Sequence, residues 1–188
     1  MALLDELDRI TAACNTGPLI SAFQCAGTEL LRRYMARLVV APAELTELER
    51  HGWKRESDEL VSEGFVVVAS GLSEVEKDQA ASLARRIAAH HLSGNADPSN
   101  HLPEAEMFVI ASRPELRCRI VLLDEKAARA VAMDIGLRVT GFPGILARAG
   151  ADGLVSKADI YRLLKSCQQQ GTHYSDALIG HVVGVYGR

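Results

Sequence analysis

Short apolar runs alternate along this chain with longer segments of helical character, and this alternation limits the folds open to it. The runs occupy residues 10–14, 38–41, 65–69, 119–123 and 137–140, and several are rich in β-branched side chains. Strands that are joined through helices need crossover connections, so they pack side by side in parallel. The sequence therefore predicts an α/β fold with a central parallel β-sheet flanked by helices on both faces.

Capping residues mark where several of the expected helices begin. Ser73 is followed by Glu76, and Ser156 by Asp159, at the spacing of a capping box. From residue 141 to the end the pattern is helical, so we expect a helical C-terminal segment. The run SGNADPSN, residues 93–100, is rich in residues that favour turns and is expected to form a loop.

Length and composition favour one domain over residues 1–188. A chain of 188 residues with 48% hydrophobic composition can bury a sizeable core. Its net charge of −3 and pI near 6.1 give no overall attraction for nucleic acid phosphates. Any RNA must therefore be bound by a local patch.

Other features of the sequence argue for a cytoplasmic protein. No apolar run approaches the roughly twenty residues of a membrane helix, and the start MALLDELDRI lacks the basic and apolar regions of an export signal. The four cysteines are far apart and show no zinc-ligand spacing, so reduced and mostly buried thiols are expected. No GxGxxG or Walker pattern is present, and we expect no nucleotide cofactor.

Acidic and amide side chains fall at or just after the predicted strand ends and in early helical turns. In open parallel sheets, ligands bind beyond the carboxyl ends of the strands. Hard cations such as Mg²⁺ and Mn²⁺ prefer oxygen ligands and need only a few carboxylates. The sequence thus predicts a divalent metal site built from Asn15, Glu47, Glu104, Glu106, Asp124 and Glu125.

Each of these side chains also has a structural interpretation when it is taken alone. Glu47 fits a solvent-facing helix position, and Glu106 fits an ion pair with a surface cation. Asp124 suits a helix cap and Glu125 a first-turn residue that interacts with the helix dipole. It is their joint placement that favours a site.

Four passages of the chain resemble the divergent PIN-like branch related to VapC-type toxins. These are CNTGPLISAF, VVAPAELTELERHG, HLPEAEMFVIAS and IVLLDEKAARAVAMDIGLRVTGFPGILARAG, which lie between about residues 11 and 181. The resemblance implies a PIN-like domain whose acidic residues bind Mg²⁺ or Mn²⁺ and cut RNA. It also implies a toxin that a cognate antitoxin-like protein neutralises, and a homodimer.

The resemblance carries over to particular residues with one departure. The first family aspartate falls on Asn15, which offers a carbonyl oxygen but neither a negative charge nor a base. The family's helix glutamate corresponds to Glu47. The family's third acidic residue corresponds to Glu104, with Glu106 as a neighbouring candidate. The fourth acid falls on Asp124 or on the glutamate that follows it.

The leading hypothesis is a Mg²⁺- or Mn²⁺-dependent endoribonuclease with Glu47, Glu104 and Asp124 as the catalytic, metal-binding core. In it, Asn15 would orient a ligand or a water molecule. The alternative is a degenerate, non-catalytic PIN-like module that binds RNA or an antitoxin partner, and Asn15 motivates it. A third reading, a domain that binds a small phosphorylated ligand, rests on fold analogy alone.

Histidines and cations elsewhere offer further candidates, each with a plainer interpretation. His90, His91 and His101 flank the predicted loop and could bring a ligand near the acids, although helix-end histidines are common. Lys54 and Arg55 beside Trp53, or the cluster Arg32, Arg33 and Arg37, could contact phosphates. Packing of the tryptophan on the domain or at a dimer contact is the stronger interpretation.

Overall fold

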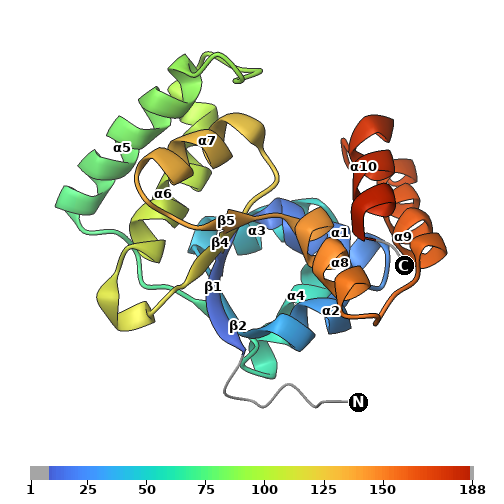
Figure 1. Ribbon diagram of the computed structural model, residues 1–188. Coiled ribbons are helices and arrows are strands. Elements are labelled where there is room, and N and C mark those ends of the chain that lie inside the picture. The colour runs from blue at the N-terminus through green and yellow to red at the C-terminus, as the bar shows by residue number, and fades with distance from the viewer. Residues whose placement is uncertain (1–8, 187–188) are drawn as a thin grey trace.

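The computed structural model of the chain describes residues 9–186, so the acidic residues 1–8 that precede the first strand lie outside the described part (Figure 1). A single sheet contains the strands β1 (Ile10–Cys14), β2 (Met35–Val40), β3 (Val66–Val68), β4 (Ile120–Leu122) and β5 (Val139–Thr140). All of its pairs are parallel, and the strand order is β3-β2-β1-β4-β5. This confirms the predicted sheet.

Helices connect every pair of consecutive strands. The helices are α1 (Thr16–Gln24), α2 (Thr28–Tyr34), α3 (Pro42–Arg50), α4 (Lys54–Ser62), α5 (Glu74–Ala89), α6 (Leu102–Ala111), α7 (Lys126–Asp134), α8 (Phe142–Ala151), α9 (Lys157–Gln169) and α10 (Asp176–Tyr186). Two short 3-10 helices, η2 (Pro98–His101) and η3 (Pro114–Leu116), complete the described elements. The last three α-helices form the predicted helical C-terminal segment.

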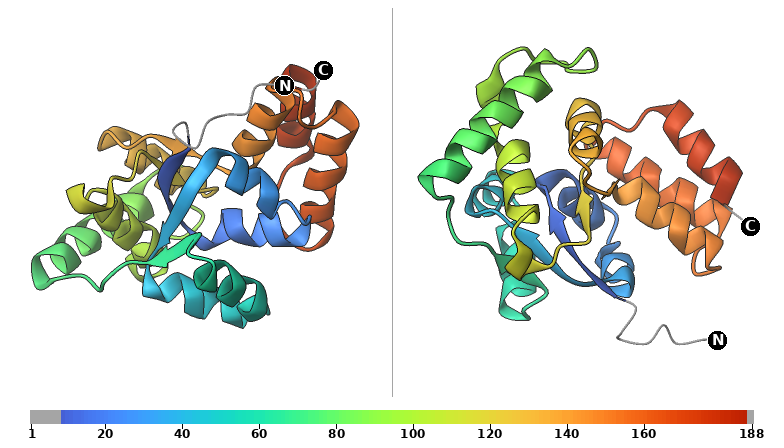
Figure 2. Two further views of the ribbon diagram at one scale, coloured as in Figure 1. Left: turned by 90° about the horizontal axis from the view of Figure 1, so that it is seen from below. Right: turned by 60° about the vertical axis from the view of Figure 1, so that its left-hand side comes forward.

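The two faces of the sheet are covered by different groups of helices. Ala12 and Cys14 of β1 join a core with α1, α2, α8 and α9, whereas Ala13, between them, packs with α5, α6 and α7. Leu122 and Leu123 at the end of β4 divide between the two cores in the same way. This alternation follows from the two-residue period of a strand. Figures 1 and 2 show α5, α6 and α7 on one side of the strands and α8, α9 and α10 on the other.

Several boundaries and two helices differ from the sequence-based expectation. Helix α1 begins at Thr16 rather than at Pro18, because the Asn15 side chain caps it by accepting a hydrogen bond from Gly17 N at 3.3 Å. Strand β2 begins at Met35 rather than at residue 38, since Met35 already pairs with β1. Helices α2 and α4 were not predicted.

The expected caps and thiols are present. The capping boxes at Ser73 and Ser156 both form, and each serine side chain accepts from the backbone of the residue three positions later. All four cysteines are free, and two of them, Cys14 and Cys167, are buried. Among residues 9–186, no helix is both long enough and apolar enough to cross a membrane.

Candidate functional site

The carboxyl ends of β1 and β4, which are neighbours in the sheet, bring an amide and a carboxylate close together. Asn15 follows β1, and its backbone N–H donates to the Leu122 carbonyl oxygen at 3.0 Å. A Cβ atom added to Gly17 would lie 3.9 Å from Asn15 Oδ1 and 4.0 Å from Asp124 Oδ2. Both side chains therefore border the first turn of α1, at the edge where open parallel sheets bind ligands.

Asp124 is fixed in place from two sides. Its Oδ2 accepts a hydrogen bond from the Tyr174 hydroxyl at 2.8 Å, and its Oδ1 accepts from the backbone N–H of Phe142 at 3.2 Å. The Tyr174 hydroxyl also lies 2.7 Å from Ser21 Oγ. Burial raises the pKa of Asp124, and these two hydrogen bonds and Arg129 oppose that shift. Each carboxylate oxygen keeps a free lone pair for a further ligand.

Two glutamates from the first turns of α3 and α6 bring buried carboxyl groups to the same edge. Glu44 is 0% exposed, and neither of its carboxyl oxygens has a hydrogen-bond partner among the described residues. Burial raises its pKa to about 8, against the opposing effect of the backbone groups of Ala41 and Glu44, and repulsion from Glu47 and Glu104 adds to the rise. Buried carboxyl groups without partners are costly for a fold, so they indicate a function.

Glu104 shares this environment. Its Oε2 is buried without a partner among residues 9–186. Burial raises the pKa of Glu104, and repulsion from Glu125 and Glu47 acts in the same direction, whereas His101 opposes it. The charge of Glu47 thus acts on both Glu44 and Glu104, and Glu125, which precedes α7, acts on Glu104.

Glu47 lies at the more open side of this cluster. Its Oε2 accepts a hydrogen bond from Thr16 Oγ1 at 2.5 Å, which ties α3 to the first turn of α1. Its side chain is 42% exposed, and His51 Nε2 lies 3.9 Å from its other carboxyl oxygen. Glu47 is therefore oriented toward the strand ends while it remains accessible to a ligand from solvent.

The two remaining acidic candidates have other partners. Glu125 caps α7, since its carboxyl oxygens accept from the backbone N–H groups of Ala127 and Ala128. Glu106 lies two residues after Glu104, on the other side of α6. Burial raises its pKa there, and Lys77 of α5 opposes that shift. The structure gathers Asn15, Glu47, Glu104 and Asp124 at one edge, leaves Glu125 there as a helix cap, and turns Glu106 away.

The donor set at this edge fits a hard divalent cation in its chemistry. Carboxylate and amide oxygens are the ligands that Mg²⁺ and Mn²⁺ prefer, and three of the buried carboxyl oxygens have no hydrogen-bond partner in the described part of the chain. As the side chains stand, no group of three or more acidic, thiol or imidazole side chains within residues 9–186 is close enough to hold an ion.

Sequence reasoning missed two members of the site. Glu44 is not among the candidates from the sequence, although Leu48, four residues later, is buried on the same face of α3. A glutamate at that spacing from a core leucine points inward, and this signal could have identified it. No comparable signal links Tyr174 to Asp124, because 50 residues separate them.

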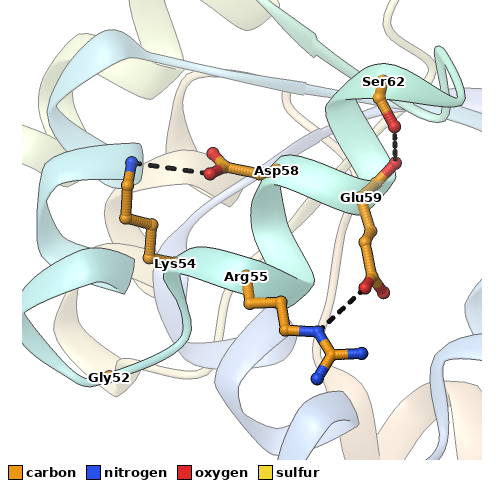
Figure 3. Close-up of a pocket in the computed structure, with 6 residues that line it drawn as sticks. All are labelled: Gly52, Lys54, Arg55, Asp58, Glu59 and Ser62. Atoms are coloured by element: carbon orange, nitrogen blue, oxygen red, sulfur yellow. Dashed lines mark hydrogen bonds and ion pairs between the residues drawn. The ribbon is translucent and has the colours of Figure 1, made fainter.

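The cations near Trp53 form a different surface, which Figure 3 shows in detail. Lys54 lies 3.5 Å from Asp58, and Arg55 lies 3.1 Å from Glu59, so acids on the same helix neutralise both cations. The Trp53 ring packs 5.5 Å from the ring of Phe23. Packing is therefore the observed role of the tryptophan, and this surface offers little attraction for phosphate.

The histidines beside the loop mostly support its structure. His101 is buried, and its Nε2 lies 2.8 Å from the Asn95 carbonyl oxygen and 3.1 Å from Ser93 Oγ. The rings of His90 and His91 stack at 4.5 Å on the far end of α5. Of these three histidines, His101 is the one that acts on the acidic edge, where its charge opposes the rise in the pKa of Glu104.

Gly141 is required for the position of Asp124, and Gly141→Ala is expected to destabilise the protein by about 1–3 kcal/mol. A Cβ atom at this position would lie 2.0 Å from Asp124 Oδ1, where the Phe142 N–H now donates. Urea unfolding measures the change. Gly180→Ala is the matched control, because Gly180 lies in α10 with nothing within 4 Å of an added Cβ, and its stability should be equal or slightly higher.

Comparison with known proteins identifies the family of this chain. No curated protein and no solved structure gives a significant match. A family model described as a PIN domain matches residues 11–187, which is nearly the whole chain. That match agrees with the parallel five-stranded sheet and with the acidic residues at its carboxyl edge. The chain therefore belongs to the PIN-domain family.

Proposed function

We propose that this protein is a Mg²⁺- or Mn²⁺-dependent endoribonuclease whose site lies at the carboxyl ends of β1 and β4. Membership of the PIN-domain family supports a nuclease-like fold. The observation that carries the proposal is three buried carboxyl oxygens, both of Glu44 and Oε2 of Glu104, that lack hydrogen-bond partners in the described part of the chain. A fold keeps such groups at a cost to its stability, and a cation would relieve that cost.

In this proposal, Glu47, Glu104 and Asp124 hold the cation, and Glu44 is a further carboxylate beside them. When bound, the cation supplies Lewis-acid chemistry and neutralises charge on the phosphate. Asn15 would add its side-chain carbonyl oxygen to the ligands of the cation, and the same side chain also caps α1. Of the surrounding groups, Thr16 orients Glu47 and Tyr174 orients Asp124, as outer partners of metal ligands do.

The test is cleavage of a fluorescently labelled single-stranded RNA by the full chain. We expect cleavage with Mn²⁺ or Mg²⁺, complete loss of cleavage with excess EDTA, and recovery when Mn²⁺ is restored. Titration calorimetry on the same preparation should detect Mn²⁺ binding. Cleavage that EDTA leaves unchanged, or the absence of both cleavage and Mn²⁺ binding, would reject the proposal.

A second candidate is a non-catalytic PIN-like module that binds RNA or a protein partner. Asn15 favours it, because an amide replaces a charged ligand at the centre of the site. The separation of the acidic side chains in the present arrangement favours it as well. Mn²⁺ binding without any cleavage of RNA would support this candidate over the nuclease.

We extend the leading proposal to a cytoplasmic toxin that acts as a homodimer and is neutralised by a cognate antitoxin-like protein. The support is the resemblance of the sequence to the VapC-related branch, together with exposed apolar side chains such as Met133 and Tyr161, which are 56% and 52% exposed. Light scattering of the purified protein would measure the dimer. Growth arrest on expression, relieved by a small neighbouring gene product, would test the toxin role.

A further inference from the structure

A cavity of about 1000 Å³ opens directly beside Asp124. It lies between the start of α7, the turn after β5, the helix α8 and the C-terminal helix α10. In Figure 1, α7 lies on one side of the strands and α8 and α10 lie on the other. Such a volume is at the upper end of the range for ligand pockets. The cavity is thus continuous with the acidic site and large enough for a nucleotide.

One side of the cavity is cationic. Lys126 and Arg129 of α7 line it close to Asp124, whereas Arg148 of α8, which also lines it, is paired with Asp152 at 2.9 Å. Lys126 is exposed and forms no ion pair with any described residue, and Arg129 donates to the Leu123 carbonyl oxygen at 2.7 Å rather than to a carboxylate. In a chain with a net charge of −3, Lys126 and Arg129 give this cavity a local attraction for phosphate, next to the carboxylates of Asp124 and Glu125 that also line it.

The opposite side of the cavity is apolar. Pro143 and Ala147 contribute from α8, and Leu178 and Val182 from successive turns of α10. Leu178 is 37% exposed and Val182 is 4% exposed, so the wall faces the opening at one end and the core at the other. The flat face of a base can pack against such a surface, because apolar contact needs no matching hydrogen bonds.

We propose that this cavity binds an unpaired nucleotide of single-stranded RNA next to the phosphodiester bond at the acidic site. Its phosphate lies against Lys126 and Arg129, and its base lies against the wall formed by α8 and α10. This proposal takes its substrate, RNA, from the proposed ribonuclease function, and it adds the site where the RNA strand is bound. The cations favour RNA over an apolar peptide segment as the occupant.

The test measures binding, in EDTA, of a fluorescently labelled single-stranded RNA to the full chain by anisotropy. Leu178→Glu places a negative charge on the apolar wall and is expected to weaken binding about 10-fold or more. Val185→Glu is the matched control on the same helix, since Val185 is 59% exposed and does not line the cavity, and it should bind as the parent does.

A second pair of variants tests the cationic side. Lys126→Ala is expected to weaken binding and to reduce the slope of log affinity against log salt by about 1, as the loss of one phosphate contact does. Lys157→Ala, at the start of α9 and outside the cavity, should leave both quantities unchanged.

The outcomes separate this proposal from the nuclease proposal. If RNA binds as expected but is never cleaved with Mn²⁺, the nuclease proposal fails and the nucleotide site remains. If the parent cleaves RNA while Leu178→Glu and Lys126→Ala bind and cleave it as well as the parent does, the nucleotide site is refuted and the nuclease stands. Loss of binding to an antitoxin-like protein in these variants, with RNA binding unchanged, would assign the cavity to a protein partner instead.

Discussion

Glu104→Gln is expected to lower Mn²⁺-dependent cleavage of RNA about 100-fold or more. The substitution keeps the shape of the side chain but removes the charge of a ligand that the proposal places on the cation. Loss of an outer partner of a metal site already costs about 10–100-fold, so loss of a direct ligand should cost at least as much. Initial cleavage rates at saturating RNA, with Mn²⁺ varied, would show both a lower maximum and a weaker apparent metal affinity.

Glu106→Gln is the control for this prediction, because it makes the same chemical change two residues along the same helix. Glu106 interacts with Lys77 of α5 and not with the acidic edge of the sheet. We expect its cleavage rate to stay within about twofold of the parent, as is usual for residues outside a site. Equal activity of Glu104→Gln and the parent would remove Glu104 from the proposed metal site.

The fold could be predicted from sequence because its signals are local. A short apolar run such as residues 65–69 or 119–123 is typical of a strand that is covered on both faces. Capping boxes mark the starts of helices directly. Helix α4 was missed because its exposed face is highly charged and only Ser57 and Leu60 are buried. Ser57 and Leu60 lie on one face of the helix, but a polar segment with so few apolar residues gives a weak signal for a buried helix.

The site could be predicted only in part, because its geometry depends on contacts between distant segments. The rule that ligands bind at the carboxyl ends of strands located Asn15 and Asp124 correctly at one edge. The same rule could not separate Glu104 from Glu106, which differ only in the side of α6 that they occupy. The burial of Glu44 depends on how α3 packs against the sheet. The cavity beside Asp124 depends on the position of α10, which forms one of its walls.

The unpaired carboxyl group of Glu44 makes a prediction about stability and pH. The pKa of this group is 4.5 as a free side chain and rises to about 8 in the folded protein, mainly because of burial. Below pH 4.5 it is protonated in both states and has no effect on stability. As the pH rises toward 8, the unfolded chain releases the proton while the folded protein retains it, so stability falls. The full loss, roughly 4–5 kcal/mol, is reached above pH 8.

Glu44→Met should remove most of this loss, since methionine fills a similar volume without a charge or an unsatisfied polar group. Urea unfolding in EDTA at pH 5 and at pH 8.5 would measure it. The gain in unfolding free energy of the variant over the parent should be larger at pH 8.5 by several kcal/mol. Glu49→Gln, an exposed position on the same helix, should show no such difference.

Metal binding connects this stability cost to the proposed function. A cation that binds the folded protein adds stability in proportion to the logarithm of its concentration above the dissociation constant. Mn²⁺ should therefore stabilise the parent at pH 8.5 and stabilise Glu44→Met less, because the variant has lost one carboxylate beside the ion. If Mn²⁺ stabilised both proteins equally while the pH effect of Glu44 was present, this carboxyl group would be buried for a reason other than metal binding. The proposed ligand set would then reduce to Glu47, Glu104 and Asp124.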